Sequence, residues 1–96
     1  MNQFFEELGQ QWVDAAQERG AKISKPELES RIALELLELA RVAAHTQERR
    51  FAPLTCYLAG VAAERLRAAT QLDEEGVAAF ILEVRRKLEA ENPRPT

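Results

Sequence analysis

The side chains that build covalent and metal-dependent sites are scarce in this chain. Its 96 residues include one cysteine and one histidine, so an internal disulfide cannot form. A zinc site needs more ligands than one cysteine and one histidine supply. The sequence also contains no phosphate-binding glycine loop and no nucleophile elbow. We therefore expect no metal, no cofactor and no catalytic residue.

A basic excess and a long apolar run are absent as well. The chain has 13 Lys and Arg against 16 Asp and Glu, a net charge of −3, whereas nucleic-acid binders usually carry a basic excess or stripe. No segment approaches the roughly 20 uninterrupted apolar residues of a membrane span. The N-terminal stretch MNQFFEELGQQW carries acids where a secretory signal has a basic start. We expect a cytoplasmic protein and do not expect it to bind membranes or nucleic acid.

The abundant residues are Ala, Leu, Glu and Arg, which are all good helix formers. Aromatic residues make up only 6% of the chain, and β-branched residues are too sparse for a sheet protein. The sequence predicts an all-α fold, a compact, four-helix bundle-like single domain of residues 1–91 with a flexible C-terminal tail at 92–96. The predicted helices span residues 3–19, 26–45, 53–69 and 74–90.

Local signals place the starts of the last three helices. The S-x-x-E sequence at residues 24–27 is a capping box with Pro26 in the first turn. Pro53 suits the first turn of the third helix and disfavours helical geometry at Ala52 before it. Asp73 is the predicted N-cap of the fourth helix.

The second and third predicted helices carry more apolar surface than the other two can cover. Gly60 lies inside the third helix, where glycine costs about 1 kcal/mol relative to alanine. We interpret it as a point where another backbone approaches closely. The excess of apolar and small residues predicts a homodimer formed through these two helices.

Polar residues concentrate at the junction between the same two helices. Arg49 and Arg50 precede a predicted helix start that carries Thr55, and such a start has unpaired N–H groups and a partial positive charge. The two arginines could hold a phosphate or carboxylate there. The alternative is that they are solvated loop charges, paired with Glu48 or with acids of the last helix.

Two other residues of the junction also have two interpretations. His45 is either a general base or ligand, or a structural residue that caps its helix or hydrogen-bonds across the junction; we favour the structural role. Cys56 lies near a helix start, where the helix dipole can lower a thiol pKa. It is equally an isolated cysteine flanked by apolar side chains, and we favour packing over catalysis.

The stretch from residue 36 to 63 also follows a longer pattern, roughly L-x-x-A-R-x-x-A-H-x-x-x-R-P-x-A-P-L-T-x-[YF]-L-x-G. The positions that match in register are Leu37, Ala40, Arg41, Ala44, His45, Arg49, Ala52, Pro53, Leu54, Thr55, Tyr57, Leu58 and Gly60. With this pattern the chain resembles a small helical domain of actinobacteria and related bacteria, found alone or next to or fused with the molybdenum-cofactor guanylyltransferase MobA. Arg50 stands where that family usually has proline.

The resemblance implies an accessory role near molybdopterin nucleotide chemistry. It also implies that five of the residues belong to one functional patch: Arg41, His45, Arg49, Thr55 and Tyr57. With Arg50 they form the predicted site for a ligand or partner, and these six residues are called the junction residues below.

Two functions follow as expectations. The first is a non-enzymatic helical accessory module that contacts a protein through the junction, either a second copy of itself or a nucleotidyltransferase of molybdenum cofactor synthesis. The alternative is a small-molecule binding domain that holds a phosphate-bearing nucleotide or pterin at the same junction.

Overall fold

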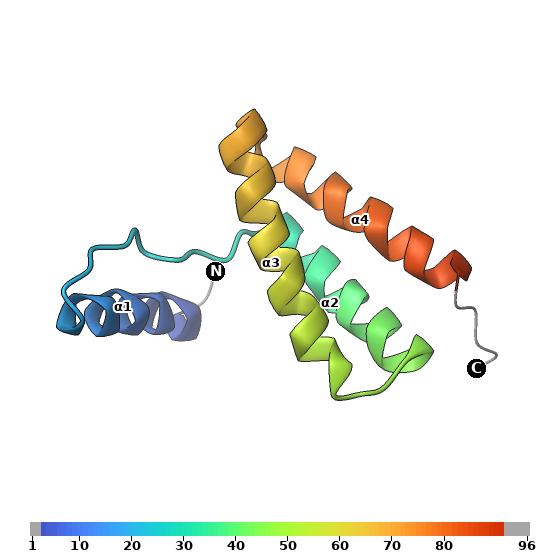
Figure 1. The fold of residues 1–96 in the computed structure, drawn as a ribbon, viewed down its shortest axis with the longest axis horizontal. Helices are drawn as coiled ribbons and strands as arrows, with labels where there is room; N and C mark the ends of the chain where they lie inside the picture. The colour runs from blue at the N-terminus through green and yellow to red at the C-terminus, as the bar shows by residue number, and fades with distance from the viewer. Residues whose placement is uncertain (1–2, 92–96) are drawn as a thin grey trace. The chain divides into compact units, whose positions relative to one another are not determined.

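The structure, a computed structural model, describes the backbone of residues 3–91 and the side chains of residues 3–90. Four helices form within this range, α1 (Gln3–Glu18), α2 (Ser30–Thr46), α3 (Phe51–Thr70) and α4 (Glu74–Glu91) (Figure 1). No strand occurs in the described part of the chain, which confirms the predicted all-α fold class. The predicted tail at 92–96 lies outside the described residues.

The chain groups into two compact units, Met1–Ser30 and Arg31–Thr96. The first unit contains α1 and the segment that follows it. The second contains α3 and α4 and all of α2 except its first residue. The single-domain assignment stays a prediction.

In the first unit, residues 21–29 are not helical, so the predicted helix start at Pro26 is wrong. The reason is contact with α1. A Cβ atom on Gly9 would lie only 2.7 Å from the carbonyl oxygen of Pro26, which shows that the two backbones touch. Nearby, the Lys25 ammonium donates a hydrogen bond of 2.7 Å to the Glu6 carboxylate. This hydrogen bond lowers the pKa of Glu6, so the contact is intact above the usual carboxyl pKa and is lost as the pH falls through the lowered value.

The start of α2 is stabilised by α4 instead of by a local capping box. The backbone N–H of Arg31 donates a hydrogen bond of 2.7 Å to Oε2 of Glu74, and the Arg31 guanidinium lies 3.2 Å from Glu75. Glu74 is also in the first turn of α4, so its negative charge is close to the positive ends of two helices. A residue from a distant part of the chain therefore sets where α2 begins.

This contact predicts unequal effects at two neighbouring glutamates. Replacing Glu74 with alanine removes a charged hydrogen-bond acceptor from an unpaired N–H of α2 and should cost about 1–2 kcal/mol of unfolding free energy. Glu75→Ala removes an exposed ion pair and should cost less than about 1 kcal/mol. Urea unfolding of both variants measures the difference, and equal losses would contradict the capping role of Glu74.

The helix α3 begins two residues before the predicted start at Pro53. Phe51 and Ala52 are helical because their N–H groups donate to the carbonyl oxygens of Glu48 and Arg49, at 3.0 and 3.2 Å. Pro53 is then the third residue of the helix, still in the first turn, where its missing N–H would have had no helical partner. The prediction that Ala52 is non-helical is therefore wrong.

The turn between α3 and α4 closes both helices. Gln71 adopts the left-handed conformation, with φ 59°, and its N–H donates to the carbonyl oxygen of Arg67 at 2.7 Å. Two residues later, Oδ1 of Asp73 accepts a hydrogen bond of 2.9 Å from the N–H of Gly76. The predicted N-cap of α4 is confirmed.

The core of the second unit lies where α2, α3 and α4 meet (Figure 1). It is built on Leu39 of α2, Ala63 of α3, and Val77 and Ile81 of α4, all buried. The first turn of α4 contacts the first turn of α2, and residues near their other ends also pair, so these two helices run in the same direction. The buried apolar residues in the described part of the chain are few: Leu39, Val42, Ala43, Ala63, Val77, Ala78 and Ile81.

Candidate functional site

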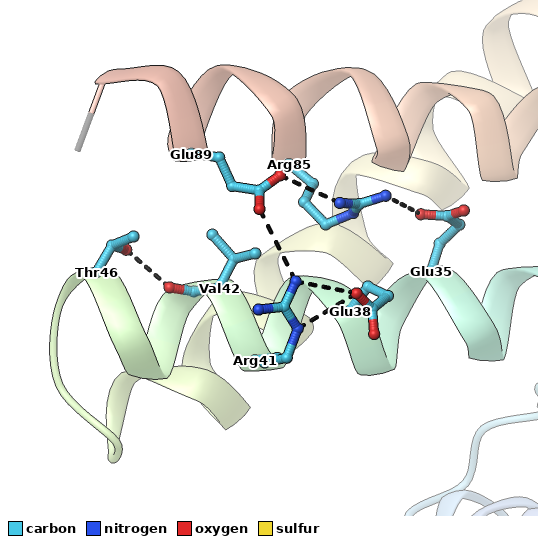
Figure 2. A network of polar contacts seen from close by, with 7 residues as sticks. All are labelled: Glu35, Glu38, Arg41, Val42, Thr46, Arg85 and Glu89. Atoms are coloured by element: carbon cyan, nitrogen blue, oxygen red, sulfur yellow. Dashed lines mark hydrogen bonds and ion pairs between the residues drawn. The ribbon is translucent and has the colours of Figure 1, made fainter. Parts of the chain in front are cut away.

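Arg41, the first junction residue, belongs to a network of charges between α2 and α4 (Figure 2). Its guanidinium lies 3.1 Å from Glu38 and 3.8 Å from Glu89. Glu89 also pairs with Arg85 at 3.2 Å, and Arg85 reaches Glu35 at 3.5 Å. Three carboxylates and two guanidiniums therefore alternate along the contact, and the charge of Arg41 is already balanced within the chain.

Arg85 is the most buried member of this network. Its side chain is 15% exposed, that of Glu35 is 16% exposed, and its Nε has no hydrogen-bond partner in the described part of the chain. No motif in the sequence marks Arg85 for a role of its own. The available signal was spacing, because Arg85 follows the buried Ile81 by four residues and precedes Leu88 by three, and therefore shares the apolar face of α4.

The other charged junction residues lie around the loop between α2 and α3. The Arg50 guanidinium pairs with Glu48 at 3.0 Å and lies 5.9 Å from the centre of the Phe51 ring. The pairing with Glu48 is the loop interaction that the sequence left open as an alternative. Arg49 and His45 are exposed, and no hydrogen bond or ion pair of their side chains occurs among the described residues.

Thr55 and Tyr57 occupy different surroundings on α3. Thr55 lines an apolar groove between α3 and α4. Tyr57 is 71% exposed and borders a separate, shallow groove of about 480 Å³ on α3, together with Cys56, Gly60, Val61, Glu64 and Arg65. The junction residues are thus divided between the α2–α4 network, the loop and two grooves, and their joint role in binding an anion stays a prediction.

Cys56 packs against α2. Its Sγ lies 3.5 Å from the carbonyl oxygen of Leu36, to which the thiol donates. Burial raises the pKa of the Cys56 thiol, so the thiolate needed for nucleophilic chemistry is disfavoured. This environment supports the packing interpretation.

The interpretation of Gly60 as a point of close approach is wrong within this chain. A Cβ atom added to Gly60 would have no atom within 4 Å apart from the adjacent backbone of its own helix. The close approach occurs instead at Gly9 in the first unit. A glycine inside a helix is compatible both with a close backbone contact and with a face that nothing packs against. The sequence alone does not distinguish these two environments.

Large apolar side chains form an exposed row along α3. Leu54 is 61% exposed, Tyr57 71% and Leu58 67%, and Val61 is partly buried. The spacing i, i+3, i+4 and i+7 places these four residues on one helix face, which we call the α3 stripe. On the neighbouring helix α2, Leu34 and Leu37 are 60% and 68% exposed.

A deeper groove, the α3–α4 groove, has a volume of about 430 Å³. The buried side chains of Leu39 and Ile81 contribute to its lining. Only two lining residues carry polar side-chain atoms, Thr55 of α3 and Lys87 of α4. The remaining lining residues are apolar: Leu58, Ala59, Ala62, Phe80, Val84 and Leu88.

Neither a metal-binding cluster nor a membrane-spanning helix occurs among the described residues. Among the described residues, no three His, Cys, Asp or Glu side chains gather closely enough to hold a metal ion. None of the described helices combines the length and the hydropathy required to cross a membrane.

Comparison with known proteins identifies a family. A family model described as a domain of unknown function (DUF6457) matches residues 6–95. No curated protein and no solved structure matches the chain. Because the matched region covers nearly all of the 96 residues, the chain belongs to the DUF6457 family.

Proposed function

We propose that this protein is a non-enzymatic helical interaction module that forms a homodimer through α2 and α3, with the α3 stripe at the centre of the contact. The observation that carries the proposal is the exposure of Leu54, Tyr57 and Leu58, each more than 60% exposed on one face of one helix. Contiguous apolar surface of this kind marks interaction sites in soluble proteins.

The small core supports the same proposal. Only seven apolar residues are buried in the described part of the chain, whereas ten large ones are exposed. A chain of this size buries a modest fraction of its surface, and association is a common way for such domains to gain stability. Leu34 and Leu37 of α2, the other helix of the proposed contact, are also exposed.

A second copy is the occupant that the composition favours. The α3 stripe itself contains no charged residue, so a matching stripe on another copy would bury no unpaired charge. A two-fold contact brings the same surface from both copies together. The further expectation, a nucleotidyltransferase of molybdenum cofactor synthesis as partner, rests on the sequence resemblance alone.

The test is the molar mass in solution of wild type and two matched variants. We expect wild type to show twice the 10.8 kDa chain mass at micromolar and higher concentrations. Tyr57→Glu places a carboxylate in the stripe and should weaken the dimer roughly tenfold or more. Ala79→Glu adds the same charge to an exposed position of α4 and should leave the dimer intact.

Light scattering coupled to size-exclusion chromatography measures the mass, and circular dichroism confirms that each variant is folded. A monomeric wild type would overturn the dimer. In that case a complex with the guanylyltransferase that Tyr57→Glu disrupts and Ala79→Glu spares would support an interaction module with a different partner. Equal behaviour of the two variants would rule out the α3 stripe as the interface.

A further inference from the structure

The α3–α4 groove has the composition of a small-molecule site. The side chains that line it are hydrocarbon, apart from the hydroxyl of Thr55 and the ammonium of Lys87. Its volume of about 430 Å³ falls within the range of roughly 300–1,000 Å³ that is typical of ligand sites. A ligand site with a mostly apolar lining and one charged group suits a molecule that has an apolar body and one group of opposite charge.

The charge that lines the groove is positive. Lys87 is the only charged residue that lines it. The stem of a lysine can cover apolar surface while its ammonium stays in water. Lys87 is exposed and lines the groove, and none of the described carboxylates pairs with its ammonium.

We infer that the α3–α4 groove binds an amphiphilic organic anion with a single aliphatic chain, such as a medium-chain carboxylate. The chain lies along the apolar lining that includes Leu39 and Ile81, and the carboxylate pairs with the Lys87 ammonium. This site is independent of the proposed dimer contact, apart from Leu58, which belongs to both the groove and the α3 stripe. The tests below leave Leu58 unchanged.

The experiment uses dodecanoate below its micelle concentration as the probe, with isothermal titration calorimetry as the measurement. Wild type should bind one dodecanoate per chain with a saturable curve. Decanoate and octanoate should bind progressively more weakly, by about threefold per methylene removed, because less apolar surface is buried. The methyl ester of the same acid should bind about tenfold more weakly than dodecanoate because it has no charge to pair with Lys87.

Two neighbouring residues of α4 provide the matched control. Lys87→Gln should weaken dodecanoate binding about tenfold and leave the affinity for the methyl ester unchanged. Arg86→Gln removes the same charge from an exposed residue that does not line the groove and should leave both affinities unchanged. The comparison separates a specific contact from the general effect of net charge.

A groove-filling variant tests the location. Ala62→Phe places a ring among the lining residues and should abolish binding, with circular dichroism confirming the helical fold. If Ala62→Phe does not fold, shifts of the amide signals of residues 58–62 and 80–88 on titration of wild type locate the ligand instead.

Several results would overturn the inference. Absence of saturable binding to wild type excludes the ligand class. Equal affinity for dodecanoate in wild type and Lys87→Gln excludes the anion contact and leaves an unselective apolar surface. If wild type does not bind dodecanoate and Ala62→Phe changes the molar mass in solution, the groove is instead part of a contact with a second copy of the chain.

Discussion

Replacing Arg85 with alanine should lower the free energy of unfolding by about 2–4 kcal/mol. The substitution leaves Glu35, whose side chain is 16% exposed, without a positive partner between α2 and α4. Glu89 and Glu38 then share only the charge of Arg41. Because some water still reaches these groups, the expected loss is smaller than that for a fully buried pair.

Urea unfolding followed by circular dichroism measures this loss. Arg86→Ala is the control, since it removes an adjacent but exposed arginine and should change the stability by less than about 0.5 kcal/mol. A double variant with Glu35→Leu and Arg85→Met replaces the pair with apolar groups of similar size and should recover stability to within about 1 kcal/mol of wild type. If it is as unstable as Arg85→Ala, desolvation of an unpaired carboxylate is not the cause of the loss.

Gly9→Ala should separate residues 21–29 from α1. The added methyl would lie 2.7 Å from the carbonyl oxygen of Pro26, a distance that requires one backbone to move. We expect a cost of about 1–3 kcal/mol for this contact, which exceeds the small gain in helix propensity. Faster amide hydrogen exchange and shifted amide signals in residues 21–29 would report the separation, while the signals of α2 to α4 stay in place.

Gly60→Ala is the matched control because the same methyl is added inside a helix, at a position where no atom beyond the adjacent backbone of that helix lies within 4 Å. It should raise the free energy of unfolding by about 0.5–1 kcal/mol, since alanine is the better helix former. Thermal unfolding at one protein concentration compares the two variants with wild type. Equal effects of the two substitutions would contradict the close contact at Gly9.

The sequence was sufficient for those elements that local chemistry determines. The predicted helices 3–19 and 74–90 agree with α1 (Gln3–Glu18) and α4 (Glu74–Glu91) to within one residue. Both are amphipathic. Asp73 caps α4 through a local hydrogen bond to Gly76, only three residues along the chain. The start of α2 could not be found in this way, because it depends on Glu74 from another helix and on a backbone contact at Gly9.

The candidate site was less accessible for a related reason. A pattern that groups Arg41, Arg49 and Thr55 along the chain carries no information about which side of each helix faces which neighbour. Arg41 pairs across to α4, and Thr55 lines the α3–α4 groove. Lys87 is chemically ordinary in sequence and becomes notable only because it is the one charge that lines an apolar groove.

The bond from Arg31 to Glu74 joins positions 43 residues apart and has a consequence for synthesis of the protein. The ribosome completes α2 and α3 before the residues that stabilise the beginning of α2 have been made. We therefore expect the first turn of α2 to fray in the nascent chain and to become ordered only when α4 docks. Arrival of the last helix then both fills the core and fixes the first boundary of the three-helix unit.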